Sequence, residues 1–229
     1  LVTVYPPQKM IPILQSFEDQ LRESAKQVDP DKTHNQRAAM ALFHESFDSL
    51  YGWGNDGSAA DCLVRLSLVR GVQGNAFKVE YELRPEHGWT YVQFNRPVSE
   101  EERFKLPNKY TVVFQFAGKG GHNRVDFKMI DGDGTNYGAS LPIPTDFKGH
   151  QYVLESDELG YLWGGADKDL GEVFNLQIAI TPDPVYEENY GPEPVGTVYL
   201  DELIILPGTG WNIPSDRPID YSVKNKKGN

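Results

Sequence analysis

The stretch HNRVDFKMI, residues 122–130, alternates polar and apolar residues as a strand with one buried face does. On such a strand the apolar residues turn inward, and Arg124, Asp126 and Lys128 share the outer face. Guanidinium, carboxylate and ammonium groups in one row supply the hydrogen-bond donors and acceptors that sugar hydroxyls require. The same row also suits an ordinary solvated surface, so the strand has two interpretations. His122 is a further candidate for bonding hydroxyls, with a purely structural histidine as its alternative.

Several aromatic residues stand beside glycines in the turn-like segments YGWG, HGWTY, TNYG and YLWGG. A pyranose ring stacks its C–H face on an aromatic plane. Binding residues also gather on loops that a rigid scaffold holds in place. The candidates for stacking on a sugar are Tyr51, Trp53, Trp89, Tyr91, Tyr137, Tyr161 and Trp163. We expect about half of them to be core residues instead, because a domain of this size needs large buried side chains.

Asp201 interrupts an otherwise apolar strand in the segment GTVYLDELIIL, residues 196–206. A carboxylate beside a core must be paired or bound to a metal, because its desolvation is costly. The alternative is that the alternation of the strand simply turns Asp201 to solvent.

Catalytic signatures are weak in this sequence. A glycosidase needs two carboxylates that face each other across the substrate. Asp201 and Glu202 are adjacent in one strand, which places them on opposite faces. The sequence contains no G-x-S-x-G elbow, no H-E-x-x-H motif and no P-loop. A lyase that uses Tyr137, His122 and Arg124 stays an alternative, since such a site has no fixed spacing. The pattern favours binding over catalysis.

From Cys62 onward the hydrophobic pattern has a period of two, which is typical of strands. Residues 62–71 and 75–85 predict a hairpin around a glycine-containing turn. About eight or nine strands in all predict an all-β sandwich of two sheets. The other predicted strands lie in residues 89–94, 109–118, 122–130, 149–155, 173–181 and 197–205.

The two ends of the chain differ from this pattern. Residues 1–15 contain a Pro-Pro pair and suit a linker or edge strand. A stretch rich in Ala, Leu, Glu, Gln and Arg predicts a short helical insertion at about 20–48, with a break at Asp29–Pro30. The sandwich is expected to span 16–206. The polar, turn-rich residues 207–229 are expected to form a flexible tail or linker.

Composition excludes several classes of protein. The chain has 22 basic and 33 acidic residues and a net charge of −11, which disfavours nucleic acid as a partner. A single cysteine, Cys62, excludes an internal disulfide and a cysteine-based metal cluster. The sequence lacks an apolar run of the roughly 18 residues that a membrane span needs. Leu1 is not a natural start, which is compatible with a trimmed leader.

Five segments, taken in order, resemble the family 11 group of carbohydrate-binding modules and its relatives in the galactose-binding-like superfamily. The likeness covers about residues 13–206, and the joint order of the segments carries it, because each one alone suits any antiparallel sandwich. The segments are ILQSFEDQ, GSAADCLVRLSLVRGVQGNAFKVEYEL, YTVVFQFAGKGGHNRVDFKMIDGDGTNYG, FKGHQYVLESDEL and GTVYLDELIIL.

The resemblance implies a jelly-roll β-sandwich of two antiparallel sheets, with a structural calcium ion where its first and last strands meet. Calcium takes six to eight oxygen ligands, from carboxylates and backbone carbonyls. Asp201 and Glu18 are the expected carboxylate ligands, with Asp19 or Glu45 as substitutes. In the resembled modules the first strand, which contains an FE pair, leads quickly into a Trp-bearing loop. Here a helix-prone stretch separates the first FE pair from YGWG, so FHESFDSLYGW, which contains Glu45, is a second candidate for the first strand.

The resemblance also implies a concave sheet face that holds a linear glucan. We therefore expect a noncatalytic, monomeric module that binds a β-glucan-like cell-wall polysaccharide within a larger, secreted or cell-surface, polysaccharide-degrading protein. Nucleic acid and membrane are not expected as partners. A structural sandwich that packs on a catalytic domain is the first alternative, and a polysaccharide lyase or glycosidase is the second.

Overall fold

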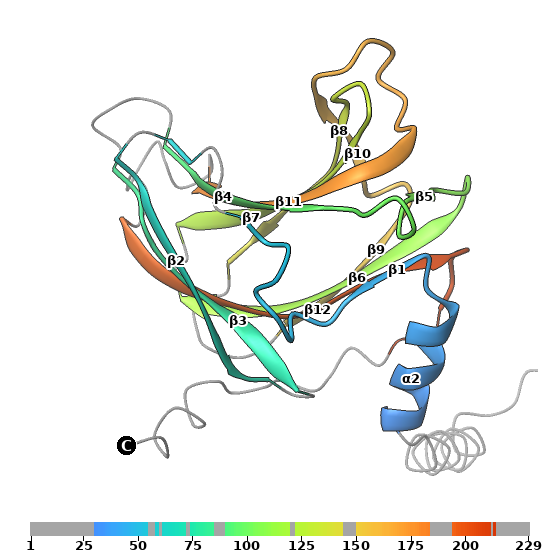
Figure 1. The fold of residues 1–229 in the computed structure, drawn as a ribbon, viewed down its shortest axis with the longest axis horizontal. Coiled ribbons are helices and arrows are strands. Elements are labelled where there is room, and N and C mark those ends of the chain that lie inside the picture. The colour runs from blue at the N-terminus through green and yellow to red at the C-terminus, as the bar shows by residue number, and fades with distance from the viewer. Residues whose placement is uncertain are drawn as a thin grey trace, which may run out of the picture. The chain divides into compact units, whose positions relative to one another are not determined.

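The computed structural model in Figure 1 describes residues 30–54, 58–59, 61–71, 74–84, 90–119, 122–143, 150–183, 194–211 and 213. The chain divides into two units, Leu1–Met40 and Ala41–Asn229. In the first unit, the described residues form helix α2, Pro30–Met40. Proline is favoured at a helix start, because the missing N–H has no partner there in any case. No helix among the described residues has the length and apolar character to cross a membrane.

The second unit folds as two antiparallel sheets, each of six strands (Figure 1). Sheet A has the order β2-β3-β12-β6-β9, with β1 paired to β12. Its strands are β1 (Phe43–Glu45), β2 (Leu63–Arg70), β3 (Asn75–Glu82), β6 (Tyr110–Lys119), β9 (His150–Glu155) and β12 (Val195–Pro207). The fold is therefore the predicted all-β sandwich, and the first described strand lies against the last.

Sheet B has the order β10-β8-β7-β11-β4, with β5 paired to β11. Its strands are β4 (Val92–Pro97), β5 (Phe104–Lys105), β7 (Asn123–Asp131), β8 (Asn136–Pro142), β10 (Gly160–Trp163) and β11 (Glu172–Pro182). In Figure 1 the two sheets form the two layers of the unit.

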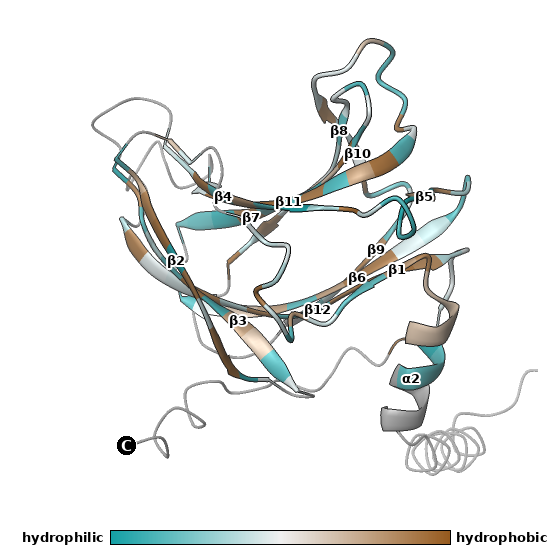
Figure 2. Cartoon of the chain, in the orientation of Figure 1, coloured by the Kyte–Doolittle hydropathy of each residue, from teal (hydrophilic) through white to brown (hydrophobic). Residues whose placement is uncertain are grey.

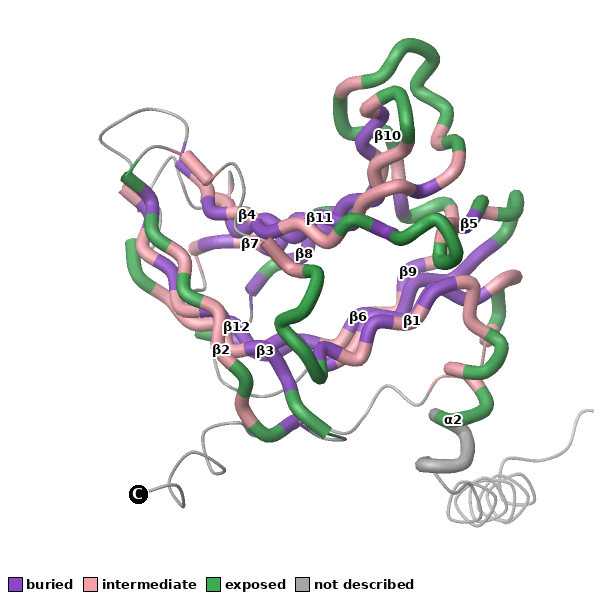
Figure 3. Tube along the Cα trace, viewed as in Figure 1, coloured by how far each residue is buried: buried purple, intermediate pink, exposed green. Residues whose placement is uncertain are grey.

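Side-chain alternation places the core between the sheets. In β3, Phe77, Val79 and Tyr81 are buried, whereas the residues between them are partly exposed. Figure 2 shows the same alternation of hydropathy along the strands, and Figure 3 shows burial concentrated in the middle of both sheets. Aromatic side chains from both layers meet in this core, as where Phe114 of sheet A contacts Phe127 of sheet B at 5.9 Å between ring centroids. Burial of such large rings supplies much of the stability of a sandwich.

The predicted hairpin is confirmed, since β2 and β3 pair antiparallel from Leu63 opposite Glu82 to Arg70 opposite Asn75. The other predicted strands correspond to β4, β6, β7, β9, β11 and β12. Alternation did not predict β5, β8 or β10, which are short or interrupted by glycine.

Two predicted boundaries need correction. The helical insertion was expected to extend to about residue 48, but helix α2 ends at Met40 and residues 43–45 form strand β1. The sandwich was expected to end at residue 206, but Trp211 and Ile213 pack against Val113 and its neighbours in sheet A. The Trp211 indole N–H also donates to the carbonyl of Pro207 at 3.0 Å. The beginning of the predicted tail is thus part of the folded unit.

Gly138 and Gly160, which are opposite each other in β8 and β10, provide a matched test of sheet B packing. A Cβ at Gly138 would lie 1.9 Å from the carbonyl oxygen of Phe127, whereas a Cβ at Gly160 has nothing within 4 Å. Gly138→Ala should therefore destabilise the fold by about 1–3 kcal/mol, the usual cost of overpacking. Gly160→Ala should change stability little. Urea unfolding midpoints measure both, and equal midpoints for the two variants would contradict this packing.

Candidate functional site

The polar row predicted on β7 lies on the side of sheet B that faces away from the core. Val125, Phe127 and Met129 are core residues, as alternation predicted. Arg124, Asp126 and Lys128 therefore share the opposite side, here called the outer face of sheet B. The pairing of β7 with β8 and β11 adds side chains to this face at the same levels: Ser140 and Ala179 beside Asp126, Gln177 beside Lys128, and Thr181 beside Arg124.

Asp126 is the centre of one hydrogen-bonded group on this face. Its Oδ1 accepts a hydrogen bond from the Ser140 hydroxyl at 2.6 Å and lies 3.0 Å from Arg124 Nε. Thr181 links the two charged residues, since its hydroxyl accepts from Arg124 Nε at 3.1 Å and donates to Asp126 Oδ2 at 3.3 Å. Asp126 is buried although it faces away from the core, and these contacts compensate for its desolvation.

Lys128 begins a second polar group on the same face. Its ammonium group donates to Gln177 Oε1 at 3.0 Å, and the Gln177 amide donates to Asn95 Oδ1 in β4 at 2.8 Å. Only 8% of Lys128 is exposed, and this burial lowers the pKa of its ammonium group. The Lys128 Nζ also lies 6.0 Å from the centre of the Trp163 ring.

The edge strand β10 exposes large apolar side chains. Tyr161, Leu162 and Trp163 are all exposed, with 56% of Trp163 accessible. A register shift between Tyr161 and Trp163 places Trp163 opposite Asn136, and its ring is the one that lies near Lys128. An exposed indole beside a polar network has both features that a sugar ring requires of a protein surface.

The turn between β7 and β8 holds the segment that follows Trp163. Asp131 Oδ2 accepts from the Gly171 amide, and Asp133 Oδ2 accepts from the Ala166 amide, each at 2.8 Å. The hydrogen bond from the Ala166 amide is the largest cause of the lowered pKa of Asp133, followed by that from the Thr135 hydroxyl. The sequence of this turn is DGDG, residues 131–134. The structure adds that the turn anchors residues 164–171, and with them the end of β10.

The structure separates the other aromatic candidates. Trp53 is partly buried against the core, with its ring 5.5 Å from Phe94 and 5.7 Å from Phe77, so it serves packing rather than an exposed face. Tyr137 is opposite Met129 and also packs against the core. Trp53 and Tyr137, named as candidates for stacking on a sugar, are therefore among the aromatic residues that serve the core instead.

The remaining candidates lie at the margins of the strands. Tyr51 is 92% exposed in the segment between β1 and β2. Tyr91 directly precedes β4, and His122 directly precedes β7; both are half-buried. Trp89 lies outside the described residues. The structure therefore brings together Arg124, Asp126, Lys128 and Trp163, and adds Gln177, Ser140 and Thr181, which only strand pairing could identify.

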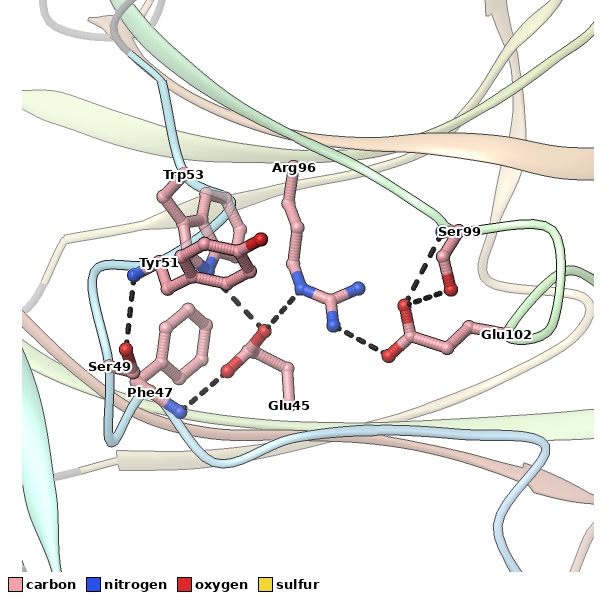
Figure 4. Close-up of polar contacts among 8 residues, drawn as sticks. All are labelled: Glu45, Phe47, Ser49, Tyr51, Trp53, Arg96, Ser99 and Glu102. Atoms are coloured by element: carbon pink, nitrogen blue, oxygen red, sulfur yellow. Dashed lines mark hydrogen bonds and ion pairs between the residues drawn. The ribbon is translucent and has the colours of Figure 1, made fainter.

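Glu45 joins the two sheets through its contacts (Figure 4). Its Oε2 lies 2.8 Å from Arg96 Nε of β4 and accepts from the Trp53 indole N–H at 3.3 Å. Its Oε1 accepts from the Phe47 amide at 2.9 Å. Arg96 also bonds Glu102 at 2.8 Å, and this hydrogen bond is the largest cause of the lowered pKa of Glu102. Glu45, named as a substitute calcium ligand, is thus the buried counterion of Arg96.

Asp201 lies where the pairing of β12 changes partner. Residues 195–200 of β12 pair with β3, residues 203–205 pair with β1, and the ladder with β6 shifts register between Leu200 and Glu202. Only 5% of Asp201 is exposed, so the interpretation that it points to solvent is wrong. The register shift permits two adjacent acidic residues in a strand that is otherwise part of the core.

The oxygens near Asp201 come from the end of the β2–β3 hairpin. A Cβ at Gly71 would lie 2.7 Å from Asp201 Oδ1 and 2.6 Å from the Asn75 carbonyl oxygen, so these two oxygens pack closely against Gly71 and lie near each other. The Asn75 amide donates to Asp48 Oδ1 at 2.5 Å, which brings a second carboxylate to the hairpin end. This donor set consists of hard oxygens, which suits calcium.

Side chains alone do not complete a metal site in the part of the chain that the structure describes. No group of three or more His, Cys, Asp or Glu side chains there could hold a metal ion. A calcium ion at Asp201 would therefore also need backbone carbonyls such as that of Asn75. Glu18 and Asp19, the predicted partners of Asp201, lie outside the described residues.

Glu45→Gln tests the role of this carboxylate as a counterion. The substitution should lower the free energy of unfolding by about 2–3 kcal/mol, because the partly buried Arg96 loses one of its two carboxylate partners. The loss should be the same with calcium or with chelator, measured by urea unfolding. A loss that disappears in chelator would instead make Glu45 a calcium ligand.

No family model matches the chain, and no curated protein matches its sequence. The chain is similar to the family 11 carbohydrate-binding module of the cellulosomal cellulase Lic26A-Cel5E of Clostridium thermocellum. The two share 12% sequence identity with a TM-score of 0.51, over 76% of this chain and 99% of that chain.

Two further structures give the same picture. A family 11 module from Clostridium thermocellum, in complex with a β-1,3-1,4-mixed-linked tetrasaccharide, has 13% identity and a TM-score of 0.50, over 73% of this chain and 95% of that chain. The module CtCBM11, solved in solution, has 13% identity and a TM-score of 0.54 over the same shares. The chain thus has the jelly-roll fold of family 11 carbohydrate-binding modules, as the resemblance predicted.

Proposed function

We propose that the chain is a noncatalytic carbohydrate-binding module that holds a β-glucan-like polysaccharide on the outer face of sheet B. The observation that carries the proposal is the meeting of an exposed indole, Trp163, with a hydrogen-bonded polar row on one sheet face. The fold supports it, because the similar family 11 module is described in complex with a mixed-linked β-glucan tetrasaccharide.

The two parts of the face have complementary tasks. Trp163 offers an apolar plane to the C–H face of one sugar ring. Arg124, Lys128 and Gln177 offer donors and acceptors to hydroxyls of the chain. Their mutual hydrogen bonds hold these side chains in place before ligand arrives, which reduces the entropy lost on binding.

The charges of this face favour binding over hydrolysis. Glycosidases use a pair of carboxylates on either side of the scissile bond. Among the side chains that the described strand pairing places beside the polar row, Asp126 is the one carboxylate, and Arg124, Ser140 and Thr181 engage it. This arrangement gives no support to an acid–base pair at this position.

The module would act as part of a larger protein. A noncatalytic glycan-binding unit is useful when it holds a linked catalytic domain against its substrate, because linkage raises the effective concentration of the second partner. We propose a secreted or cell-surface polysaccharide-degrading protein as this context, with the module itself monomeric.

Calcium is proposed as a structural ion at the hairpin end. Asp201 and Asp48 would supply carboxylate oxygens, and Asn75 would supply its carbonyl. The close approach of the Asp201 and Asn75 oxygens at Gly71 and the hard-oxygen donor set support this assignment. Calcium there would tie β12 to both the β2–β3 hairpin and the segment after β1, and would stabilise the fold without taking part in glycan recognition.

Substitution of Trp163 tests the binding face. Trp163→Ala should weaken binding to soluble mixed-linked β-glucan at least tenfold, or about 1.4 kcal/mol, because the stacking plane is lost. Affinity electrophoresis beside a reducing-sugar assay measures binding and cleavage together. Leu63→Ala, which truncates a side chain of similar exposure in sheet A, is the matched control and should bind as wild type does.

Retardation without new reducing ends supports a binding module. New chain ends would show an enzyme, and unsaturated products a lyase. Wild-type protein that no cellulose derivative, mixed-linked β-glucan, xyloglucan, mannan or xylan retards would contradict glycan binding and favour a structural sandwich.

Chelation tests the proposed ion. Calcium at a hundred times its dissociation constant should stabilise the wild-type fold by about 2.7 kcal/mol, because it binds the native state preferentially. Chelator should therefore lower the melting temperature of wild type but not that of Asp201→Asn or Asp48→Asn. Asp157→Asn, at an exposed position, is the control and should respond as wild type does. An unaffected wild-type melting temperature would refute the site.

A further inference from the structure

Lys128 is a buried cation without a carboxylate of its own. Among the described residues it forms no ion pair, and its hydrogen bond goes to the neutral Gln177 side chain at 3.0 Å. Burial of an ammonium group is costly unless an opposite charge compensates. Burial lowers the pKa of Lys128 by more than the nearby Asp126 charge raises it, so the cation is incompletely compensated.

The neighbouring carboxylate is already engaged. Asp126 lies next but one to Lys128 in β7, yet its two oxygens are taken by Arg124, Ser140 and Thr181. The charged side chains of the polar row are thus two cations and one anion. This local excess of positive charge lies in a chain whose net charge is −11, so composition alone does not account for it.

The surface beside Lys128 has room for a ring. In the strand pairing, Lys128 is opposite Gly138 of β8, and Gly138 is opposite Gly160 of β10. Neither glycine carries a side chain; a Cβ at Gly160 would point into open space, whereas a Cβ at Gly138 would meet the Phe127 carbonyl, so the room lies over Gly160. Trp163 bounds this glycine floor, with Lys128 Nζ 6.0 Å from its ring centre.

Resting on the proposed glycan-binding function, we propose that Lys128, Gly138, Gly160 and Trp163 form a subsite for a uronic acid residue of a β-linked polysaccharide. The ring packs on the indole over the two glycines, and its carboxylate pairs with the Lys128 ammonium group. A neutral hexose at this position offers only hydroxyls and leaves the buried cation uncompensated.

Two physical effects make such a subsite selective. An ion pair is stronger in a largely buried position than in water, because the local dielectric constant is lower. The cation is also in place before the ligand arrives, so its desolvation has already occurred in the folded protein. The glycan with the largest increase in affinity is therefore the one that places a negative charge beside Lys128.

Two matched polymers test the subsite: a linear β-glucan, and the same polymer oxidised at C6 to carry carboxylates. Wild type should bind the oxidised polymer at least tenfold more tightly at low salt, and added salt should reduce the preference. The overall charge of −11 opposes nonspecific attraction to a polyanion, so a preference must come from a local cation.

Lys128→Gln should remove the preference, so that its affinities for the oxidised and the neutral polymer become equal, because Gln keeps a hydrogen-bond donor without the charge. Lys168→Gln is the control: this exposed lysine lies 5.4 Å from the Tyr161 ring centre and should leave the preference unchanged. The wild-type comparison of the two polymers needs no variant, so it decides the question independently of the folding of Lys128→Gln.

The outcomes separate the subsite from the general function. Equal affinity for both polymers, or tighter binding of the neutral one, overturns the uronate subsite and leaves the glycan-binding module intact. A preference that persists in Lys128→Gln also overturns it. Binding to neither polymer contradicts the proposed function, and the subsite with it.

Discussion

Strand β7 determines the arrangement of the candidate site, because its side chains point alternately into the core and onto the outer face of sheet B. Val125, Phe127 and Met129 are fully buried between the sheets, and this packing fixes the register of the strand. Arg124, Asp126 and Lys128 must then occupy the other side. A slip of one residue would expose the apolar set and bury three charges, so the fold and the site share one constraint.

The closing strand β12 has a comparable role in sheet A. It pairs with β6 along its length and with both β3 and β1 on the opposite edge, and Asp201 lies at the change of partner. The buried pair of Glu45 and Arg96 then links β1 to β4 of the other sheet. The first and last described strands are therefore held together by backbone pairing, and the two layers by a desolvated ion pair next to the aromatic core.

Side-chain orientations that follow from the alternation of a strand were predictable from the sequence, whereas contacts between residues far apart in the chain were not. The orientation of Arg124, Asp126 and Lys128 follows from alternation alone. Trp53 and Trp163 have nearly identical contexts, YGWG and YLWGG, yet Trp53 packs on Phe77 and Phe94 and Trp163 is exposed. The difference arises from contacts far along the chain. The sequence likewise could not predict that Lys128 bonds a neutral side chain, since its hydrogen-bond partner Gln177 is 49 residues away. Asp48 was not predicted as a candidate calcium ligand, because only the folded structure places it beside Asn75 at the end of the β2–β3 hairpin.

The central claim is that glycan binds on the outer face of sheet B, and residue-resolved NMR titration with a linear β-glucan oligosaccharide tests it most directly. The account predicts chemical-shift changes at the Trp163 indole N–H, the Gln177 side-chain amide and the backbone of β7, with sheet A unaffected. Shifts confined to sheet A, or no shifts at saturating oligosaccharide, would contradict it.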